Sequence, residues 1–388
     1  MKFVLAAGGT AGHINPALAL AEELCDRGHE VMMLGNPLGL EARLVQEAGL
    51  PFIGIASSGF DRAHLSSAVG FIRRVQKGKQ ILKRRFKEEQ VDALVGFGAY
   101  VEVAATLAAR KLKIPYMLHE QNSVPGLANR YCSRHAHLVA LSYPEAKPYF
   151  AWRGKMPKTR FITTGNPVRR SLLMHEPLLA REALGIKEDE RLLLIFGGSL
   201  GARHLNESLI AALEIILAQK DLKVIHASGA QDYENACMLF NAEFDRLLSQ
   251  GKLKESDRQR WQIHEYINDM GVYMRAADLV ISRAGASSLA EISALALPAL
   301  LVPYPYARAN HQFKNAQHLL KSGAAQLIAD ADLDNKELLW SCLRSFLGDK
   351  DAAQNMRLKA LELSGEGASY KLANAAELVA EGMNGAGI

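Results

Sequence analysis

The pattern that most constrains the fold is a short apolar strand, then glycines, then a helix, and it occurs twice. In the first copy a predicted strand at 2–7 leads through the loop 8–13 (GGTAGH) into a predicted helix at 16–27. In the second copy a predicted strand at 191–196 precedes a glycine-rich loop and a helix from about Asn206. Strands that alternate with helices form parallel sheets covered on both faces. The sequence therefore predicts an α/β protein with two Rossmann-like, doubly wound domains.

Further predicted strands share the same short, apolar character, and they lie at 30–34, 93–96, 115–119, 138–140, 223–227, 262–266, 279–282 and 299–302. In the first helix Asn15 is the expected N-cap, Pro16 an expected first-turn residue and Gly28 the expected stop. These signals place the helix after the glycine loop, so the loop is free to meet a ligand.

The two domains are expected to join within residues 156–167, where prolines and Gly165 interrupt the pattern. We therefore predict an N-terminal domain over 1–164 and a C-terminal domain over 165–364. A last helix, about 369–381 within the segment 365–388, is predicted to pack back on the first domain.

Composition excludes several classes of protein. The 388 residues exceed one typical core, and 49% apolar with 22% charged residues is ordinary for a soluble globular chain. The four scattered cysteines include no C-x-x-C pair, which argues against a disulfide framework and favours a reducing compartment. No stretch reaches the roughly 20 apolar residues that span a bilayer. The net charge of +5 favours anionic ligands or an anionic membrane surface.

Ligands in parallel sheets bind at the carboxyl ends of the strands, so the first loop is a candidate site. It lacks the G-x-G-x-x-G spacing, and no acidic residue ends the second strand, which disfavours a dinucleotide cofactor. His13 closes this loop. It is either a general base, since imidazole titrates near neutrality, or a histidine that only orders the turn.

The second loop, residues 197–203 (GGSLGAR), supports two interpretations. It matches G-x-S-x-G between a strand and a helix, which would make Ser199 a hydrolase nucleophile. We favour a phosphate cradle, in which Ser199 and neighbouring backbone N–H groups bind a diphosphate.

The third and fourth loops precede two later helices. Gly285, Ala286 and Ser287 aim helix N-terminal amides at an anion, and Glu291 is either a ribose ligand or a carboxylate near a positive helix end. In the fourth loop, residues 310–315 (NHQFKN), polar side chains are suited to sugar hydroxyls or simply begin a helix; they include His311, Gln312 and Asn315.

Metal motifs are weak in this sequence. Asp330 and Asp332 form a D-x-D, the motif that holds a metal in one class of glycosyltransferases, but a surface turn is the interpretation we favour. Neither His119 nor His264 begins an H-E-x-x-H motif. The sequence predicts no metal site and no obligatory cofactor.

Residues 66–87 carry no acid and combine basic with bulky apolar side chains. A solvated basic helix face is the simplest interpretation, and contact with an anionic membrane is the functional one. Nucleic acid is disfavoured because no aromatic stacking platform accompanies the charge. The candidate membrane residues are Phe71, Ile72, Val75, Lys79, Leu82, Arg85 and Phe86.

Together the loops resemble those of the MurG family of bacterial N-acetylglucosaminyltransferases. The matching stretches are GGTAGHINPALALAEEL, GFGAYVEVAATLAARKLKIPYMLHEQNSVPGLANR, GNPVR, GGSLGARHLN, YINDM, SRAGASSLAEISALALPALLVPYP and NHQFKNA, between residue 8 and about 316. The chain departs from the family pattern at Ala11, Ala99, Leu200, His311 and the run that begins at Glu102.

The resemblance implies a two-domain GT-B fold and transfer of N-acetylglucosamine from UDP-N-acetylglucosamine to lipid I, which is undecaprenyl-pyrophosphoryl-linked N-acetylmuramyl-pentapeptide. The N-terminal domain would take the acceptor and the C-terminal domain the donor. The implied location is peripheral, at the cytoplasmic face of the bacterial inner membrane, with no nucleic acid and with other cell-wall synthesis proteins as possible partners.

The resemblance also assigns roles to individual residues. His13 would be the base, and the donor would contact Thr10, Gly12, Asn122, Arg169, Ser199, Ile267, Gly285, Ala286, Ser287, Glu291, His311, Gln312 and Asn315. A single in-line displacement would invert the sugar configuration. The competing interpretations are another GT-B lipid or natural-product glycosyltransferase, a serine hydrolase, a sugar-nucleotide epimerase and a non-catalytic nucleotide-sugar-binding protein.

Overall fold

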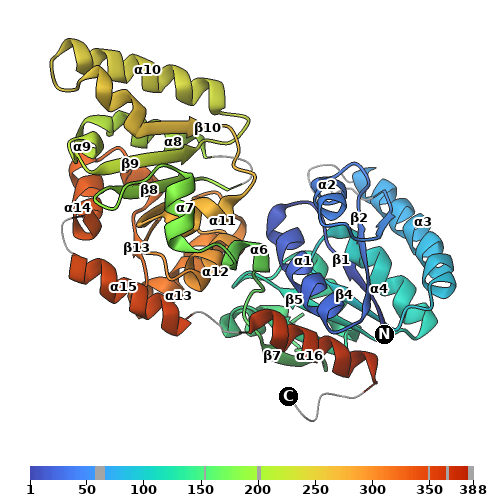
Figure 1. Cartoon of the computed structure of the whole chain (residues 1–388). Helices are drawn as coiled ribbons and strands as arrows, with labels where there is room; N and C mark the ends of the chain where they lie inside the picture. Colours follow the sequence, from blue (N-terminus) through green and yellow to red (C-terminus); the bar gives the residue numbers. More distant parts are fainter. Residues whose placement is uncertain (57–65, 153, 199–201, 348–349, 364–366, 383–388) are drawn as a thin grey trace. The chain divides into compact units, whose positions relative to one another are not determined.

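The computed structural model describes residues 1–56, 66–152, 154–198, 202–347, 350–363 and 367–382, and it divides the chain into two compact units (Figure 1). Unit 1 comprises Met1–Arg169 with Gly365–Ile388, and unit 2 comprises Arg170–Ser364. Each unit has its own parallel sheet and its own core. Two Rossmann-like domains are thus confirmed as the fold class.

Among the described residues of unit 1, seven parallel strands form the sheet. In spatial order they are β3 (Phe52–Gly54), β2 (Glu30–Gly35), β1 (Lys2–Ala6), β4 (Ala93–Gly96), β5 (Tyr116–Glu120), β6 (Leu138–Leu141) and β7 (Arg160–Thr163). The order runs outward in both directions from β1 and β4. Loops diverge at such a switch point, which leaves room for a ligand at the carboxyl ends of these strands.

Helices cover both faces of this sheet. They are α1 (Ala11–Asp26), α2 (Leu40–Glu47), α3 (Ser66–Glu88), α4 (Tyr100–Leu112), α5 (Leu127–Cys132) and α16 (Ala368–Ala380), with 3-10 turns at Ser133–His135 and Pro144–Phe150. Side chains of α1 and α16 share one apolar cluster, and those of α3, α4 and α5 share the other. The last helix of the chain is therefore part of the core of unit 1.

Polar contacts also fix α16 to unit 1. The Arg27 guanidinium donates to Glu377 Oε2 at 2.8 Å and to Asn374 Oδ1 at 2.7 Å. It also lies 4.6 Å from the ring centre of Tyr370. Since Arg27 closes α1, this residue joins the first helix of the chain to the last.

The first helix begins earlier than the caps in the sequence predict. It starts at Ala11, with Thr10 in an extended conformation as N-cap, so Asn15 is not the cap and Pro16 lies inside the helix. A proline there cannot donate the usual hydrogen bond to the residue four positions earlier. Burial of Ile14 and Pro16 against the sheet offsets that loss. As a result His13 belongs to the first helical turn rather than to the loop.

In the described part of unit 2, six parallel strands form the sheet in the order β10 (Trp261–His264), β9 (Leu222–Ala227), β8 (Arg191–Phe196), β11 (Leu279–Ser282), β12 (Ala299–Leu301) and β13 (Gln326–Leu327). Its switch point lies between β8 and β11. The two units thus place equivalent strands, β1 with β4 and β8 with β11, at the centre of each sheet.

The helices of unit 2 are α6 (Arg170–Leu173), α7 (Pro177–Ala183), α8 (Arg203–Ala211), α9 (Leu213–Leu217), α10 (Tyr233–Ser249), α11 (Met270–Ala276), α12 (Ala286–Ala294), α13 (His311–Ser322), α14 (Lys336–Leu347) and α15 (Lys350–Leu363). Short 3-10 turns lie at Glu255–Arg260, Arg308–Asn310 and Asp330–Asp332. None of the helices in the described ranges of either unit has both the length and the apolar character that crossing a membrane requires.

Candidate active site

His13 lies at the start of α1, directly beyond the carboxyl end of β1. Its Nδ1 is 3.2 Å from the carbonyl oxygen of Gly8 and 3.5 Å from Thr10 Oγ1. A carbonyl oxygen can only accept, so Nδ1 carries the proton and Nε2 is the basic nitrogen of the neutral ring. This is the tautomer that a general base needs if Nε2 faces the substrate.

The turn after β4 passes next to the His13 ring. Gly98 has a φ of +96°, and a Cβ placed there would lie 3.6 Å from His13 Nε2 and 3.2 Å from Asn129 Nδ2. The positive φ strains any L side chain, and the short contact to Asn129 adds crowding. Glycine at this position therefore lets the turn after β4, the start of α1 and Asn129 of α5 approach one another closely.

Three buried glutamates hold the loops at this edge of unit 1, and the sequence interpretation gave none of them a structural role. Glu41 accepts from the backbone N–H of Asn36 at 2.8 Å and of Gly9 at 3.3 Å. Glu102 accepts from the N–H of Gly98 at 2.5 Å. Each carboxyl thus replaces solvent as the hydrogen-bond partner of a buried loop amide.

Glu120, the third of these residues, is the last residue of β5. Its carboxylate accepts from the N–H groups of Asn122 at 3.0 Å and Gly126 at 3.1 Å, and from Asn129 Nδ2 at 2.8 Å. Burial raises the pKa of Glu120, and these donors oppose the increase. The side-chain Nδ2 of Asn122 also donates to it at 3.3 Å, so Asn122 is anchored at the end of β5.

Two glycines in the sequence could have pointed to two of these glutamates. A Cβ on Gly8 would lie 2.4 Å from Glu41 Oε1, and one on Gly96 would lie 2.6 Å from Glu102 Oε2. Gly8 follows a central strand and Gly96 ends one; the sequence interpretation placed Gly8 in a ligand-binding loop and Gly96 only at the end of a strand. Their structure shows that they also leave space for a carboxyl side chain of the same chain.

The histidine that precedes Glu120 in β5 is structural. His119 is fully buried, its Nε2 lies 3.0 Å from the carbonyl oxygen of Gly165, and Gln121 Nε2 approaches its Nδ1 at 3.1 Å. Burial lowers the pKa of His119 to about 4. The ring is therefore neutral at pH 7 and ties β5 to the segment that leads toward unit 2.

In unit 2, the loop after β11 leads directly into α12. Gly285 is the N-cap in an extended conformation, and Ala286 and Ser287 begin the helix. Behind this loop, the buried Asn315 of α13 donates from Nδ2 to the Ala284 carbonyl at 3.5 Å. Glu291 is in the second turn of α12. The structure thus brings residues of the predicted third and fourth loops together within unit 2.

The same loop contains a buried arginine that the sequence interpretation missed. Arg283 is only 6% exposed and forms an ion pair with Asp330, and it also donates to the Val302 carbonyl at 3.2 Å. Asp330 accepts in addition from His204 at 2.8 Å. The D-x-D is a 3-10 turn with no buried residue, as the surface-turn interpretation expects, and within it the half-buried Asp330 also balances a buried guanidinium.

Gln312 and His311 begin α13. Gln312 Oε1 accepts from the Tyr304 N–H at 2.9 Å, which leaves its Nε2 as the donor end of the amide, and His311 Nδ1 lies 2.9 Å from the Arg308 carbonyl. Before them, Ala309 has a φ of +50°. A left-handed alanine is strained, and such strain is concentrated at functional sites.

The remaining predicted donor-binding residues lie on separate elements of the two units. Ile267 follows β10, at the edge of the sheet of unit 2, with its side chain buried. Arg169 ends the first of the two segments that form unit 1, and Gly12 is the second residue of α1. Ser199 lies outside the described residues.

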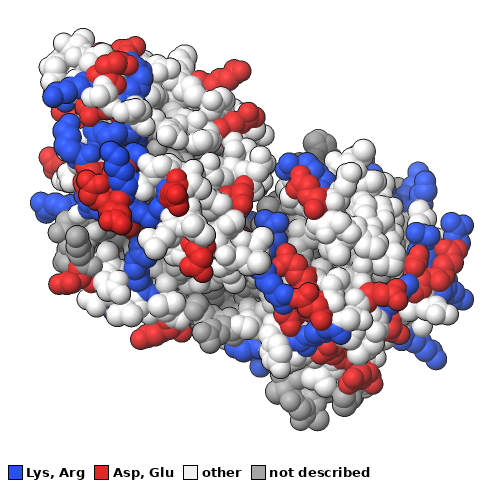
Figure 2. Space-filling view, in the orientation of Figure 1, with Lys and Arg blue, Asp and Glu red and all other residues white. Residues whose placement is uncertain are grey.

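The predicted membrane face of α3 needs correction. Leu82 is 0% and Phe86 1% exposed, and both belong to the core of unit 1, together with the partly buried Val75. They cannot contact lipid because they pack against the sheet. The apolar residues that α3 does expose are Val69, Ile72 and Ile81. Figure 2 shows basic side chains interspersed with acidic ones along the edge of unit 1 where α3 lies.

Comparisons with known proteins agree on one family. Residues 3–141 match the glycosyltransferase family 28 N-terminal domain, and residues 192–375 match its C-terminal domain. A relative from Halothermothrix orenii is 36% identical over 98% of this chain and all of its own length. Its name is UDP-N-acetylglucosamine–N-acetylmuramyl-(pentapeptide) pyrophosphoryl-undecaprenol N-acetylglucosamine transferase.

Two further proteins extend this agreement. A Listeria monocytogenes relative with the same name is 36% identical over 97% of this chain and 98% of its own. The crystal structure of Acinetobacter baumannii MurG superposes with a TM-score of 0.70 at 29% identity, covering 97% of this chain and 99% of that one. The similarity therefore covers both units.

Proposed function

The chain belongs to glycosyltransferase family 28, in its MurG group, and on that premise we propose how its residues transfer N-acetylglucosamine. It is an N-acetylglucosaminyltransferase that uses UDP-N-acetylglucosamine and lipid I and produces lipid II. The full-length similarity to transferases of this one name is the observation that carries the function. The roles of individual residues below are our proposals.

Unit 2 takes the sugar nucleotide. The start of α12 offers helix N-terminal N–H groups, and the buried Arg283 beneath it adds positive charge that Asp330 balances. Glu291 binds the ribose hydroxyls, and the backbone after β10 at Ile267 meets the uracil. Gln312, with His311 and Asn315 behind it, binds sugar hydroxyls through its amide. Thr10, Gly12 and Asn122 contribute from the loops of unit 1.

Unit 1 takes the acceptor and supplies the base. His13 Nε2 removes the proton of the C4 hydroxyl of the N-acetylmuramyl group while that oxygen attacks C1 of the donor sugar. The bond from C1 to the UDP oxygen breaks, and UDP leaves with the electron pair. The displacement is in line, so the α-linked donor gives a β-linked product.

The departing diphosphate gains negative charge as the bond breaks. Arg169 and the N–H groups at the start of α12 stabilise this charge, and Ser199 with its glycine-rich neighbours supplies the second cradle. Groups that are already oriented toward developing charge contribute about 3–4 kcal/mol each in sites from which water is excluded.

Radiolabelled UDP-N-acetylglucosamine and a short-chain lipid I analogue test this function directly. We expect label to move into the lipid product with release of one UDP per sugar transferred. A reaction without acceptor should release neither UDP nor an epimerised sugar. Label that remains on the nucleotide with every acceptor offered would contradict the transferase function.

We further propose that unit 1 contacts an anionic membrane surface through the first half of α3. Ile72 is 57% exposed and Val69 55%, and both are adjacent to the exposed Arg73 and Arg74. The ring of Phe71 lies edge-on to that of Tyr100, which extends the apolar surface to the start of α4. Apolar side chains among basic ones suit an interface with acidic headgroups, where each basic residue contributes about 1 kcal/mol.

Sedimentation with vesicles tests this surface. The protein should bind phosphatidylglycerol vesicles and bind phosphatidylcholine vesicles weakly, and Ile72→Glu should reduce binding about tenfold through lost apolar contact and added repulsion. Leu358→Glu is the matched control, since Leu358 is 50% exposed on α15 of unit 2. Equal losses in the two variants would contradict the assignment to α3.

A further inference from the structure

Of the three glutamates that hold the loops of unit 1, Glu102 is the one whose carboxyl has too few hydrogen-bond donors among the described residues. Its Oε2 accepts the Gly98 N–H, whereas its Oε1 is buried and has no hydrogen-bond partner in the described part of the chain. Glu120, by contrast, accepts from both backbone and amide donors through its two oxygens. The two acids hold neighbouring loops but in different electrostatic states.

The position of Glu102 explains its contact with the turn. It is the third residue of α4, and its own N–H donates to the Ala99 carbonyl at 3.0 Å, so its side chain folds back over the end of β4. It lies directly over Gly96, where any Cβ would collide with it at 2.6 Å. The carboxyl therefore fills the space between the end of β4 and the Gly98 turn.

No cation compensates this acid: within the described residues Glu102 forms no ion pair with lysine, arginine or histidine. Burial raises its pKa to about 8; the Gly98 N–H and the Cys132 thiol oppose the increase, and the charge of Glu120 adds to it. At neutral pH the carboxyl is therefore mainly the neutral acid.

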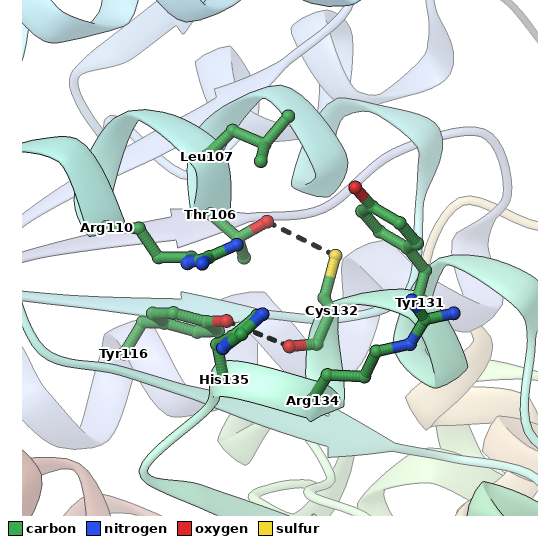
Figure 3. A pocket seen from close by; sticks show the side chains of 8 residues that line it. All are labelled: Thr106, Leu107, Arg110, Tyr116, Tyr131, Cys132, Arg134 and His135. Atoms are coloured by element: carbon green, nitrogen blue, oxygen red, sulfur yellow. Dashed lines mark hydrogen bonds between the residues drawn. The ribbon is translucent and has the colours of Figure 1, made fainter. Parts of the chain in front are cut away.

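Two titratable groups packed near Glu102, Cys132 and Tyr116, stay uncharged as well. Cys132 of α5 approaches Thr106 Oγ1 with its sulfur at 3.2 Å, and its carbonyl accepts from the Tyr116 hydroxyl at 2.8 Å (Figure 3). Burial raises the pKa of both Cys132 and Tyr116. The other ionisable groups nearby are Glu120 of β5, Arg110 of α4, whose charge acts on Cys132 and Tyr116, and, across Gly98, His13 of α1. From α3, Gly78 packs on Ala104 of the same helix as Glu102 and brings no charge.

We propose that Glu102, in its neutral form, is a positioning residue that holds the Gly98 turn against His13 for the transfer reaction. This proposal rests on the function proposed above. The neutral carboxyl fills the space above Gly96 and accepts the Gly98 N–H without placing a charge in the core. Glu102 thereby keeps the Gly98 turn and Asn129 in their present positions relative to His13.

Ionisation of Glu102 disturbs this arrangement, although a carboxylate is the stronger acceptor for the Gly98 N–H, because it leaves a buried charge without a cation. A carboxylate buried with no cation costs several kcal/mol unless water or structural change relieves it. Relief requires the Gly98 turn to open, because the turn covers the carboxyl. Turnover therefore falls at alkaline pH, whereas nucleotide affinity, which belongs to unit 2, does not.

Profiles of kcat against pH test this for the wild type, Glu102→Gln and Glu102→Ala. We expect the wild-type kcat to fall about tenfold per pH unit above the transition. Glu102→Gln, whose amide imitates the neutral acid, should move this fall upward by about one pH unit or more. Glu102→Ala should lower kcat about tenfold, as expected for a misplaced catalytic group, with KM for UDP-N-acetylglucosamine within about twofold. Glu145→Gln, an exposed acid of unit 1, is the control.

A second measurement does not depend on turnover. In the protein without substrates, the imidazole NMR signal of His13 should report a second, alkaline transition, and Glu102→Gln should abolish it. An alkaline fall of kcat that is unchanged in Glu102→Gln would overturn the proposal, as would a His13 signal with the same transitions in both proteins. If the wild type transfers no sugar, the proposed function fails, and the NMR titration still decides the role of Glu102.

Discussion

The carboxyl ends of the strands carry glycine-rich loops in both units, but different side chains lie beneath them. In unit 1 the loops after β1, β4 and β5 rest on the carboxyls of Glu41, Glu102 and Glu120. In unit 2 the loop after β11 contains the buried Arg283, paired with Asp330. Similar backbone patterns thus stand in different electrostatic surroundings.

Because of this difference, the loops of unit 1 are suited to being held in place, whereas the loop after β11 in unit 2 is suited to binding an anion. Backbone N–H groups that donate to a buried glutamate are not available to a diphosphate. The start of α12 attracts an anion instead, and the Arg283–Asp330 pair beside it adds no net negative charge. We therefore expect unit 1 to position groups for the chemistry and unit 2 to supply most of the nucleotide affinity.

The largest effect should follow from His13→Ala. Loss of a general base typically lowers turnover about 100- to 10,000-fold, so we expect kcat to fall within that range. The Kd of UDP, measured by calorimetry, should change less than about twofold, because unit 1 contributes little nucleotide affinity. His135→Ala, an exposed histidine of the same unit, is the control. A large rise in the Kd of UDP in His13→Ala would contradict the expectation that unit 2 supplies most of the nucleotide affinity.

A smaller effect is expected for Glu291→Ala in unit 2, and it should appear in UDP binding rather than in kcat. Loss of charged hydrogen bonds to the ribose costs about 1.5–3 kcal/mol, which corresponds to roughly a 10- to 100-fold rise in the Kd of UDP. With saturating donor, kcat should remain close to that of the wild type. Glu337→Ala, an exposed acid of the same unit, should have no effect. A fall in kcat with unchanged Kd would place Glu291 among the groups that act on the reaction.

The smallest effect is expected for Glu120→Gln, and it concerns stability. Half of the amide cannot accept hydrogen bonds, so donors now bound to one carboxylate oxygen lose their partner. We expect a loss of about 1–2 kcal/mol in the free energy of unfolding, measured with urea. An unchanged urea midpoint would mean that the loops of unit 1 do not depend on the buried carboxylates.

Much of the fold could be predicted from local sequence. The strands β1, β4, β8 and β11 are short apolar runs with a glycine at the end or within three residues after it, and strands buried on both faces of a parallel sheet are such apolar runs. The strands β3, β7 and β13 were missed because each has only two to four residues and most of those residues are half-buried or exposed. Pairing with a neighbouring strand, rather than local composition, makes them strands.

The sequence by itself determined the two glycine-loop domains and His13 as a candidate base, since glycines before a helix have the same backbone role wherever they occur. Only the tertiary structure decided which charges meet. Arg283 and Asp330 are 47 residues apart along the chain, and Leu82 and Phe86 face the core because the sheet lies on their side of α3. A buried charge is favourable only beside its partner, and the fold alone brings distant partners together.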